Sequence, residues 1–398
     1  MTMLGAIFNS LSGMDAYTAG LQTISNNVAN LNSSGYKQTV QTFGAMVDDS
    51  GTAFLGDSAD KDTGAGVHIA STLTDFTQGT LTATDNDLDL GIQGSGFLVV
   101  LSPDGKTFYT RTGSFAVDKD GYISDQATGE RLAVLDASGH PVAVNLNSKR
   151  NSPAQATQTI TFTNNLSSDA SSDTVSNITV TDAKGNQEVL SAVFTKNTDS
   201  GLTDNWSVQF QDAGGNAVGL PLTLNFIGDT PDDVSQSQSI SFTPASGGDQ
   251  MTVKVDFTQL TSQAGGSSST ASATADGNVS GTLSSVTVDD TGQILLTYTN
   301  QKTEQEGAVA IADFQNPQVL TKLSDGLYKN DSGVTPGLFA SNTGGVGTLT
   351  PKTIEASNVD LSAEFGDLIL LQRGFQACSE VISVSNDMIQ QLFAIRGQ

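Results

Sequence analysis

The sequence predicts an α+β, multidomain fold with paired N- and C-terminal coiled-coil-like helices, an all-β middle domain and an inserted all-β outer domain. Apolar residues recur at seven-residue steps at both ends of the chain, and between the ends the apolar period changes from seven to two. Two stretches rich in Ser, Thr, Asn, Ala and Gly, 147–174 and 262–282, bracket an inserted part of the β region. A chain of 398 residues is long enough for two to four domains of ordinary size.

The N-terminal helix is predicted by a coiled-coil-like seam. Its members are a heptad set and the residues three positions after it, namely Ile7, Met14, Leu21, Val28, Tyr17, Ile24 and Leu31. Asp15 is the only charged residue from Met1 to Tyr36, so the polar face consists of Asn, Ser, Thr and Gln. Helices that face water usually carry Lys and Glu instead, and this composition therefore favours a helix that is desolvated on several sides.

The stretch SNNVANLNSSGYK, residues 25–37, predicts the end of this helix. It contains four asparagines, two adjacent serines and a glycine. Asn side chains can bind the last helical carbonyls and Asn tolerates a left-handed backbone, while Gly35 permits the chain to turn away. We therefore expect the chain to leave the helix here and to turn towards the β region.

The C-terminal helix is predicted by the same period, over about 36 residues from Ser357 to Leu392. Its seam consists of Leu361, Leu368, Phe375, Ile382 and Ile389, joined three residues on by Leu371, Cys378 and Leu392. For a single stripe, the buried face of an ordinary amphipathic helix is the commoner explanation. Two stripes of one period at opposite ends of the chain favour helices that pack together.

The middle of the chain is predicted to be all-β, because strand-like runs alternate with turn signals such as SPDG, DKDG, DAKGN and DDTG. The runs are FLVVL (97–101), TFYTRTGSFAV (107–117), TITFT (159–163), NITVTD (177–182), WSVQFQ (206–211), LTLNF (222–226), SISFT (239–243) and MTVKVDF (251–257).

The motifs that suggest catalysis or metal binding fail on their spacing. DKDGYISD, residues 118–125, would place Ala116 and Ala127 at ligand positions of an EF-hand, so it predicts a hairpin turn. GKT at 105–107 lacks the upstream glycine of a P-loop, because Val100 stands there. We therefore predict a protein that is not an enzyme and has no catalytic residue, no cofactor and no metal site.

The histidines and the cysteine support the same conclusion. His68 and His140 are the only histidines, and their Gly- or Ser-flanked surroundings predict surface loops. The single cysteine, Cys378, excludes an internal disulfide framework and any Cys-based zinc cluster. Its heptad position predicts a small thiol that packs in the helical seam.

The charge of the chain limits its partners. There are 42 Asp and Glu against 17 Lys and Arg, for a net charge of −25. This excess repels nucleic-acid phosphates and anionic membranes, so we predict neither as a partner. No apolar run approaches the roughly 20 residues that span a bilayer, and the N-terminus lacks a basic n-region, so we expect a soluble protein without a cleaved signal peptide. Asp85, Asp87 and Asp89 are expected to form a solvated strand edge.

Several stretches resemble the flagellar axial proteins, the family of rod, hook and hook-associated subunits. SNNVANLNSSGYK is similar to the signature that closes their first helix, with Ser33 in place of the usual Thr and Tyr36 in place of the usual Phe. DLDLGIQGSGFLVV (87–100) and YTRTGSFAVDKDGYI (109–123) resemble the β module of hook and rod subunits. EASNVDLSAEFGDLILLQRGFQACSEVISVSNDMIQQL (355–392) resembles their C-terminal helix.

The inserted region favours hook subunits within this family, because rod subunits are generally shorter and lack a large inserted domain. VTVDDTGQILLTYTNQKTEQEGAVAIADFQNPQVL (286–320) resembles the return of the chain into the middle domain. The resemblance covers roughly 1–145 and 285–398, whereas 147–282 matches only in position and β character.

The resemblance implies a structural subunit that assembles in many copies into a bent, flexible tube, the flagellar hook, which acts as a universal joint and transmits torque from rod to filament. It implies the distal rod, hook cap and hook–filament junction proteins and the flagellar export apparatus as partners. It also implies an extracellular location in the basal body and hook, and export without a cleaved signal peptide.

The resemblance assigns two roles to the terminal segments. The assembly interface would consist of Ile7, Leu11, Met14, Tyr17, Leu21, Ile24, Val28, Leu31, Leu361, Leu368, Leu371, Phe375, Cys378, Ile382, Ile389 and Leu392. The hinge would consist of Asn26, Asn27, Asn30, Asn32, Ser33, Gly35 and Tyr36. A helix of about 36 residues runs roughly 50 Å, so neighbouring subunits are expected to cover what the shorter N-terminal helix leaves exposed.

The expected domains are nested. They are a terminal helical core (1–32 and 357–398), a connecting hinge segment (33–70 and 350–356), a β-rich middle domain (71–146 and 283–349) and an inserted β-rich outer domain (147–282).

Two alternatives remain. One is a distal rod or hook-associated axial protein. The other is a secreted, acidic, β-rich polysaccharide-acting enzyme or an adhesin, for which one tryptophan and six tyrosines make an aromatic-lined cleft hard to build.

Overall fold

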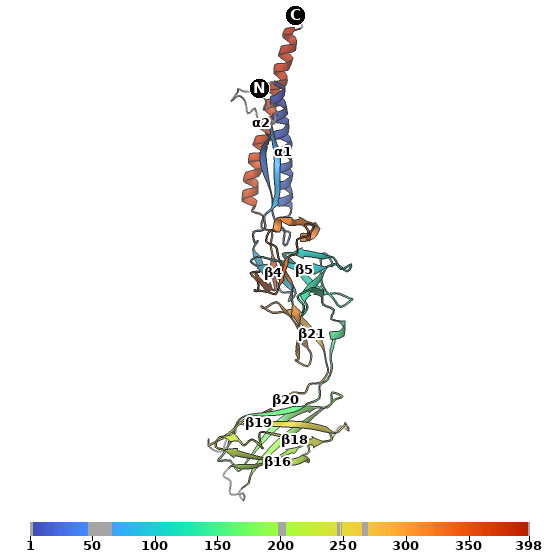
Figure 1. The fold of residues 1–398 in the computed structure, drawn as a ribbon, viewed down its shortest axis with the longest axis vertical. Coiled ribbons are helices and arrows are strands. Elements are labelled where there is room, and N and C mark those ends of the chain that lie inside the picture. The colour runs from blue at the N-terminus through green and yellow to red at the C-terminus, as the bar shows by residue number, and fades with distance from the viewer. Residues whose placement is uncertain are drawn as a thin grey trace, which may run out of the picture. The chain divides into compact units, whose positions relative to one another are not determined.

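The computed structural model describes residues 3–46, 66–197, 204–244, 247, 249–264 and 270–396 (Figure 1). The chain forms two compact units: the first consists of Met1–Asn147, Val286–Leu295 and Gln305–Gln398, and the second of Ser148–Ser285 and Leu296–Glu304. The second unit takes in most of the expected insertion, 147–282, and adds residues 296–304 from the return segment.

The terminal helices α1 (Met3–Ala29) and α2 (Leu361–Arg396) lie side by side in the first unit (Figure 1). Helix α2 begins four residues later than expected because Asp360 caps it. The Asp360 carboxylate accepts the backbone N–H groups of Ser362 and Ala363 at 2.8 and 3.3 Å, and so satisfies two N–H groups that lack helical partners.

Small residues dominate the face of α1 that is buried within the chain. Its buried positions are Ser10, Gly13, Ala16, Gly20, Ile24 and Asn27. A Cβ atom added at Gly13 would lie 2.8 Å from Cys378 Sγ, and one at Gly20 would lie 2.7 Å from Leu371 Cδ1. The two helices therefore approach closely along a line of small side chains, and the larger seam residues flank that line.

Two glycines of α2 should respond in opposite directions to alanine. A Cβ at Gly374 would lie 2.6–2.9 Å from three ring carbons of Tyr17, whereas one at Gly366 would meet no atom within 4 Å. Gly374→Ala should lower the free energy of unfolding by about 1–3 kcal/mol through overpacking. Gly366→Ala should raise it by about 0.5–1 kcal/mol through helix propensity. Circular dichroism at 222 nm during denaturation tests this, and equal shifts of one sign would contradict the close helix packing.

A two-stranded antiparallel ribbon packs along α1. It is formed by β1 (Thr39–Met46) and β2 (Gly66–Thr74), and the ring of Phe43 in β1 lies 6.0 Å from that of Tyr17. These strands occupy much of the described part of the segment 33–70, which was expected to connect the helix to the β region; residues 47–65 lie outside the described part.

The exposed His68 lies in β2, so its prediction as a loop residue was wrong, whereas His140 is exposed in a turn.

The β region of the first unit is built around a 12-stranded sheet. Its main path runs β25-β26-β6-β5-β9-β8-β7-β4-β28, with β10, β24 and β27 attached. The bounds are β4 (Asp89–Gln93), β5 (Phe97–Leu101), β6 (Thr107–Thr110), β7 (Thr112–Val117), β8 (Ile123–Asp125), β9 (Arg131–Leu135), β10 (Pro141–Ala143), β24 (Ile311–Asp313), β25 (Leu320–Lys322), β26 (Tyr328–Asn330), β27 (Gly337–Phe339) and β28 (Thr348–Pro351). A separate pair joins β3 (Leu81–Ala83) to β29 (Thr353–Glu355).

The core of this sheet is aromatic. Phe97 packs against Phe76, Phe314 and Tyr328 with ring centroids 5.5–5.9 Å apart, mostly edge to face.

Asp89 is only 4% exposed and accepts hydrogen bonds from Asn86 and Ser114, both at 2.6 Å. Its prediction as part of a solvated edge was wrong, because local donors compensate the buried carboxylate.

The second unit holds two sheets around one apolar core. The first sheet orders β18 (Ser237–Phe242), β19 (Met251–Gln263), β12 (Thr159–Ser167) and β20 (Ser272–Ala275), with β12 and β19 parallel. The second orders β13 (Ser172–Thr181), β14 (Gln187–Lys196), β15 (Asn205–Gln211), β16 (Ala217–Ile227) and β17 (Thr230–Pro231). Phe162, Phe194, Phe210, Phe257 and Trp206 are fully buried in their shared core.

The remaining elements are a sheet and three short 3₁₀ helices. The sheet orders β11 (Asn151–Ser152), β21 (Gly281–Val288), β22 (Gln293–Tyr298) and β23 (Thr303–Ala308), and the helices are Asn147–Lys149, Pro317–Val319 and Ser324–Gly326. Every strand run predicted from the sequence lies within a strand or a pair of strands, apart from single residues at its ends, but β12, β13, β16 and β19 extend four to six residues beyond the predicted runs.

One hairpin turn occurs five times among the residues that the structure describes, each time with an aspartate followed three residues later by a glycine of positive φ. The pairs are Asp118 with Gly121, Asp136 with Gly139, Asp182 with Gly185, Asp212 with Gly215 and Asp289 with Gly292. Each carboxylate accepts the backbone N–H groups two and four residues on, at 2.8–2.9 Å. DKDG, residues 118–121, is thus confirmed as a hairpin turn, joining β7 to β8.

These turns should make the second unit sensitive to acid. The side chain of Asn186 and backbone N–H groups hold the pKa of Asp182 below its usual range, and Asn216 does the same for the pKa of Asp212. A folded-state pKa below the unfolded value of about 3.9 means stability that is complete above that pH and is lost as pH falls through the folded pKa. Asp182→Asn with Asp212→Asn should flatten this loss, measured by fluorescence of Trp206 during denaturation between pH 5 and pH 2. An unchanged pH profile would contradict the role of these carboxylates.

Candidate assembly surfaces and hinge

The predicted seam residues lie on α1 and α2, except Leu31, which follows α1, and few of them are fully buried. Ile24 is buried, and the half-buried members are Ile7, Met14, Tyr17, Leu21, Val28, Leu31, Leu368, Leu371, Phe375, Cys378, Ile382 and Ile389. Leu11, Leu361 and Leu392 are exposed. A single chain therefore covers only part of the seam.

A second apolar face of α2 was missed by the sequence reasoning except for Leu392. We call Leu370, Val381, Val384, Met388 and Leu392 the outer stripe; these side chains are 42–69% exposed. Their spacings of eleven, three, four and four residues place them on one side of the helix. Phe365, Ile369 and Phe393 add exposed apolar surface elsewhere on α2, and Phe8 does so on α1. So much contiguous apolar surface marks an interaction site.

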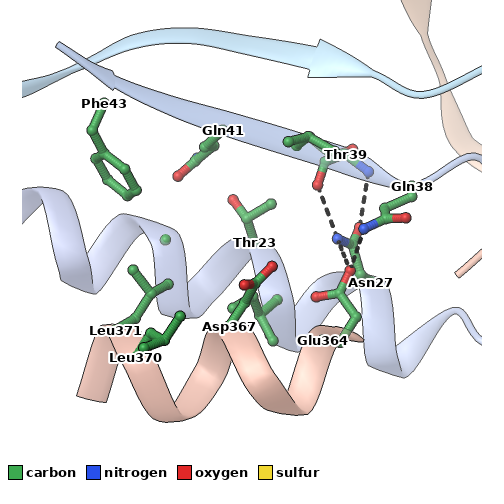
Figure 2. Close-up of a pocket in the computed structure, with 13 residues that line it drawn as sticks. Thr23, Asn27, Gln38, Thr39, Gln41, Phe43, Glu364, Asp367, Leu370 and Leu371 are labelled. Carbon is green, nitrogen blue, oxygen red and sulfur yellow. Dashed lines mark hydrogen bonds between the residues drawn. The ribbon is translucent and has the colours of Figure 1, made fainter. Parts of the chain in front are cut away.

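Asn27 fixes the end of α1 to its surroundings. It is 1% exposed, and its amide donates to the Thr39 carbonyl at 2.9 Å and to Glu364 Oε1 at 2.8 Å. Its Oδ1 accepts from the Thr39 N–H at 3.0 Å and from the Tyr36 hydroxyl at 3.1 Å. Figure 2 shows the bonds of Asn27 to Thr39 in β1 and to Glu364 in the first turn of α2. One asparagine thus joins α1 and β1 to the start of α2, which lies more than 300 residues further along the chain.

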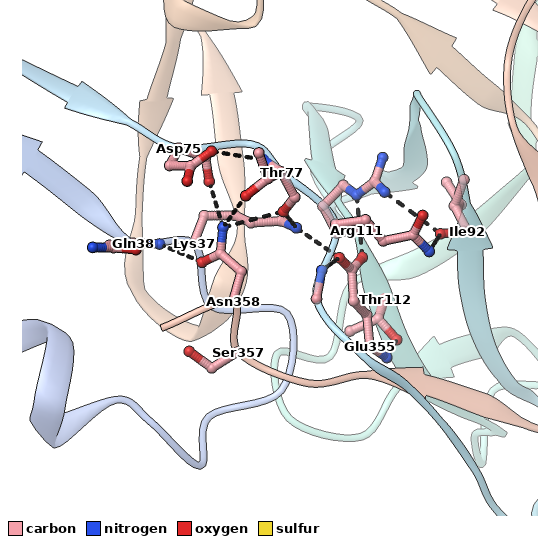
Figure 3. Close-up of polar contacts among 12 residues, drawn as sticks. Lys37, Gln38, Asp75, Thr77, Ile92, Arg111, Thr112, Glu355, Ser357 and Asn358 are labelled. Carbon is pink, nitrogen blue, oxygen red and sulfur yellow. Dashed lines mark hydrogen bonds and ion pairs between the residues drawn. The ribbon is translucent and has the colours of Figure 1, made fainter. Parts of the chain in front are cut away.

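A buried ion cluster holds the chain where it passes from the helices to the β region (Figure 3). Glu355, fully buried in β29, binds Lys37 Nζ at 2.6 Å and Arg111 Nε at 3.2 Å, and its Oε1 accepts the Gly79 N–H at 2.7 Å. Lys37 also donates to the Thr77 carbonyl at 2.6 Å, and Arg111 donates to the carbonyls of Gly94 and Gly96. Lys37 lies 74 residues before Arg111, and Arg111 lies 244 residues before Glu355, so no local pattern in the sequence predicted this cluster.

Burial sets the protonation chemistry of the cluster. Desolvation lowers the pKa of Lys37, and the nearby Glu355 carboxylate partly offsets that effect. Lys322 lies with its ammonium 3.4 Å from the centre of the Tyr36 ring and donates to the Lys37 carbonyl at 2.8 Å, and burial lowers its pKa to about 8. The passage from the helices to the β region is therefore held by hydrogen-bonded charged groups and not by apolar packing.

The proposed hinge residues fall into an exposed and a buried set. Asn26, Asn32 and Ser33 are exposed and Asn30 is half-buried, while Asn27, Gly35 and Tyr36 are buried. Gly35 has φ 68°, its N–H donates to the Glu355 carbonyl at 2.7 Å, and a Cβ would lie 2.9 Å from Thr112 Cγ2. A glycine is therefore required at this turn, as the sequence had suggested.

No catalytic or metal arrangement is found in the described part of the chain. Within it, no three His, Cys, Asp or Glu side chains form a group that could hold a metal ion. The helices that the structure describes include none long and apolar enough to span a bilayer.

Known proteins resemble the chain over its full length. Residues 91–182 match the family described as the flagellar hook protein FlgE/F/G D1 domain, and residues 350–395 match the flagellar basal body rod FlgEFG protein C-terminal family. The chain is 29% identical over 418 residues to the flagellar hook protein FlgE of Escherichia coli (strain K12), covering 98% of this chain and 100% of that protein. It is 29% identical over 471 residues to FlgE of Treponema pallidum (strain Nichols), covering 99% and 100%.

The crystal structure of the Helicobacter pylori flagellar hook protein FlgE2 shares the fold, with a TM-score of 0.51 and 12% identity, covering 69% of this chain and 100% of that one. The matched family is one of structural proteins and not of enzymes. Residues 91–182 and 350–395 thus match models of the flagellar rod and hook protein family, and the chain is similar to the hook proteins along its whole length.

Proposed function

We propose that this chain is the structural subunit of a bacterial flagellar hook, which assembles in many copies into a bent, flexible tube and transmits torque from rod to filament as a universal joint. The observation that carries the proposal is the outer stripe, because a helix of 36 residues leaves five large apolar side chains 42–69% exposed in the described part of the chain. The full-length similarity to hook proteins favours the flagellar hook as the assembly in which such a helix would pack.

The energetics favour assembly through the terminal helices. Fully burying a Leu, Val or Met side chain contributes about 1.5–3 kcal/mol, so neighbours that covered the outer stripe would supply several kcal/mol per subunit. We therefore place the assembly interface on the seam residues and on the outer stripe together. Contacts repeated at every subunit then make a polymer stable although each contact is modest.

The hinge residues have a narrower role in this proposal than the sequence alone suggested. Asn27 and Tyr36 are buried and hydrogen-bonded at either end of the hinge stretch. Bending within a subunit would then be confined to the exposed Asn32 and Ser33 between them. Most of the flexibility of the tube would come from contacts that slide between subunits.

The proposal extends to partners and location. A hook subunit would contact the distal rod, the hook cap and the hook–filament junction proteins, and it would pass through the flagellar export apparatus without a cleaved signal peptide. It would work outside the cell, in the hook above the basal body.

Electron microscopy of flagellar basal bodies from a strain that lacks only this gene tests the proposal. Complete rods and rings without a hook are expected. Particles that stop within the rod would assign the chain to the rod instead, and intact hooks and filaments would overturn the proposal.

A further inference from the structure

A cleft of about 230 Å³ lies between α1, β1 and α2 (Figure 2). The side chains of Thr23, Gln41 and Asp367 point into the space between the three elements, and Phe43 and Leu371 form an apolar wall. The cleft is therefore shaped for a side chain that has both an apolar stem and a polar end.

The chemistry of the cleft selects a cation. Glu364 and Asp367 both line it, and none of its lining residues is basic. The Oε1 atom of Gln41 is buried and has no hydrogen-bond partner, although a buried carbonyl oxygen normally accepts one. Burial raises the pKa of Glu364, and the neighbouring charge of Asp367 contributes to the rise. Two carboxylates and an unused acceptor thus face a space that no cation of the described chain fills.

Arg373 is the basic residue of the terminal helices best placed to enter such a cleft. Helix α1 contains no Lys or Arg, and α2 contains only Arg373 and Arg396, of which the described side chain is Arg373. Arg373 is exposed and makes no ion pair with the residues that the structure describes. It lies nine residues after Glu364, or two and a half turns, and so on the opposite side of α2. It does not line the cleft of its own chain.

We propose that the cleft receives the guanidinium of Arg373 from a second copy of this chain. A guanidinium offers planar donors for a carboxylate and for the Gln41 oxygen, and its aliphatic stem suits the wall of Phe43 and Leu371. Arg373 also follows Leu370 of the outer stripe by three residues, so a neighbour that covers the stripe brings Arg373 to an interface. This inference rests on the proposed function as a polymer subunit and names one contact within it.

The arrangement explains why such a contact would continue from copy to copy. Each chain carries the cleft on one side of α2 and the arginine on the other, which makes the contact heterologous, and heterologous contacts form rings or open helical assemblies. Nine residues along a helix correspond to about 13–14 Å, so parallel neighbouring α2 helices would be displaced axially by about that distance.

Charge reversal in the full-length chain tests the contact. Asp367→Arg and Arg373→Asp are exposed changes, and each should raise the concentration needed for polymerisation by roughly tenfold or more, because like charges would then face each other. The double variant should recover most of this loss. A mixture of the two single variants should also recover it, because each variant supplies the partner that the other lacks. Polymer measured by sedimentation and electron microscopy is the readout, with circular dichroism as the control for helix content.

The outcomes separate this inference from the proposed function. Recovery in the double variant and in the mixture supports the contact. Recovery in the double variant alone would place the pair within one chain and overturn it, and so would single variants that polymerise as well as the wild type. A wild-type chain that forms no tubular polymer, together with intact hooks in the deletion strain, would instead overturn the proposed function.

Discussion

A charge placed in the outer stripe should abolish polymerisation and leave the individual chain folded. Val384 and Met388 are 47% and 42% exposed and lie four residues apart on α2, so they point to one side of the helix. In the double variant Val384→Asp with Met388→Asp, an assembled neighbour would have to bury two carboxylates in place of two apolar side chains. Because less than half of each side chain remains to be covered, the lost apolar transfer is about 0.6–1.4 kcal/mol per side chain, and desolvating two unpaired carboxylates costs more, so the concentration needed to polymerise should rise roughly 100-fold or more.

The matched control is Ser383→Asp. Ser383 is exposed, adjoins Val384 in sequence and points to a different side of α2. The Ser383→Asp variant introduces a carboxylate into the same turn but outside the outer stripe. The concentration needed to polymerise should therefore change by less than about tenfold. Sedimentation measures the polymer and circular dichroism measures the helix. If both variants assembled equally well, the outer stripe would not be an assembly surface.

The β elements and the helix positions were accessible from the sequence because their signals are local. Alternation over four to eight residues, bounded by a turn, is enough to mark a strand, and the turns at Asp118, Asp182 and Asp289 occur at turn signals named from the sequence. Gly35 was predictable for the same reason, since a polar helix end followed by glycine signals a turn. The ribbon of β1 and β2 was not, because TVQTFGAM and GVHIASTLT alternate between polar and weakly apolar residues.

The packing of the helices was predicted only in part, because heptad counting considers large apolar residues alone. It found the seam but not the small residues Gly13, Ala16 and Gly20, which carry almost no hydropathy signal and which set how closely α1 and α2 approach. It also passed over the outer stripe except for Leu392, since a helix with two apolar faces has a weak amphipathic pattern. The interface proposed here therefore combines residues that periodicity identifies with residues that only exposure reveals.

The ion cluster shows a different limit, since nothing in one sequence pairs Glu355 with Lys37 and Arg111. Replacing its single carboxylate should strongly destabilise the first unit. In Glu355→Gln the side-chain shape is kept, but Lys37 and Arg111, which are 0% and 3% exposed, lose their common counter-charge. Breaking a buried pair by removing one partner costs about 3–5 kcal/mol, because an uncompensated charge stays buried.

The two units allow this effect to be localised. Both helices belong to the first unit and the only tryptophan, Trp206, belongs to the second, so circular dichroism at 222 nm and tryptophan fluorescence report on different units. Glu355→Gln should lower the denaturant midpoint of the first signal and leave the second unchanged.

Asp87→Asn is the control for Glu355→Gln. It tests whether the Glu355 cluster behaves as a buried cluster or as an ordinary surface ion pair. Asp87 pairs with Lys352 at 2.7 Å, but the two side chains are 40% and 59% exposed, so its loss should cost no more than about 1 kcal/mol. The short distance does not make this a strong pair, because water already solvates both charges. Similar shifts for Glu355→Gln and Asp87→Asn would mean that water reaches Lys37 and Arg111 in solution. A large shift for Glu355→Gln alone would show that the passage from helices to β region is held by charges that cannot be left unpaired.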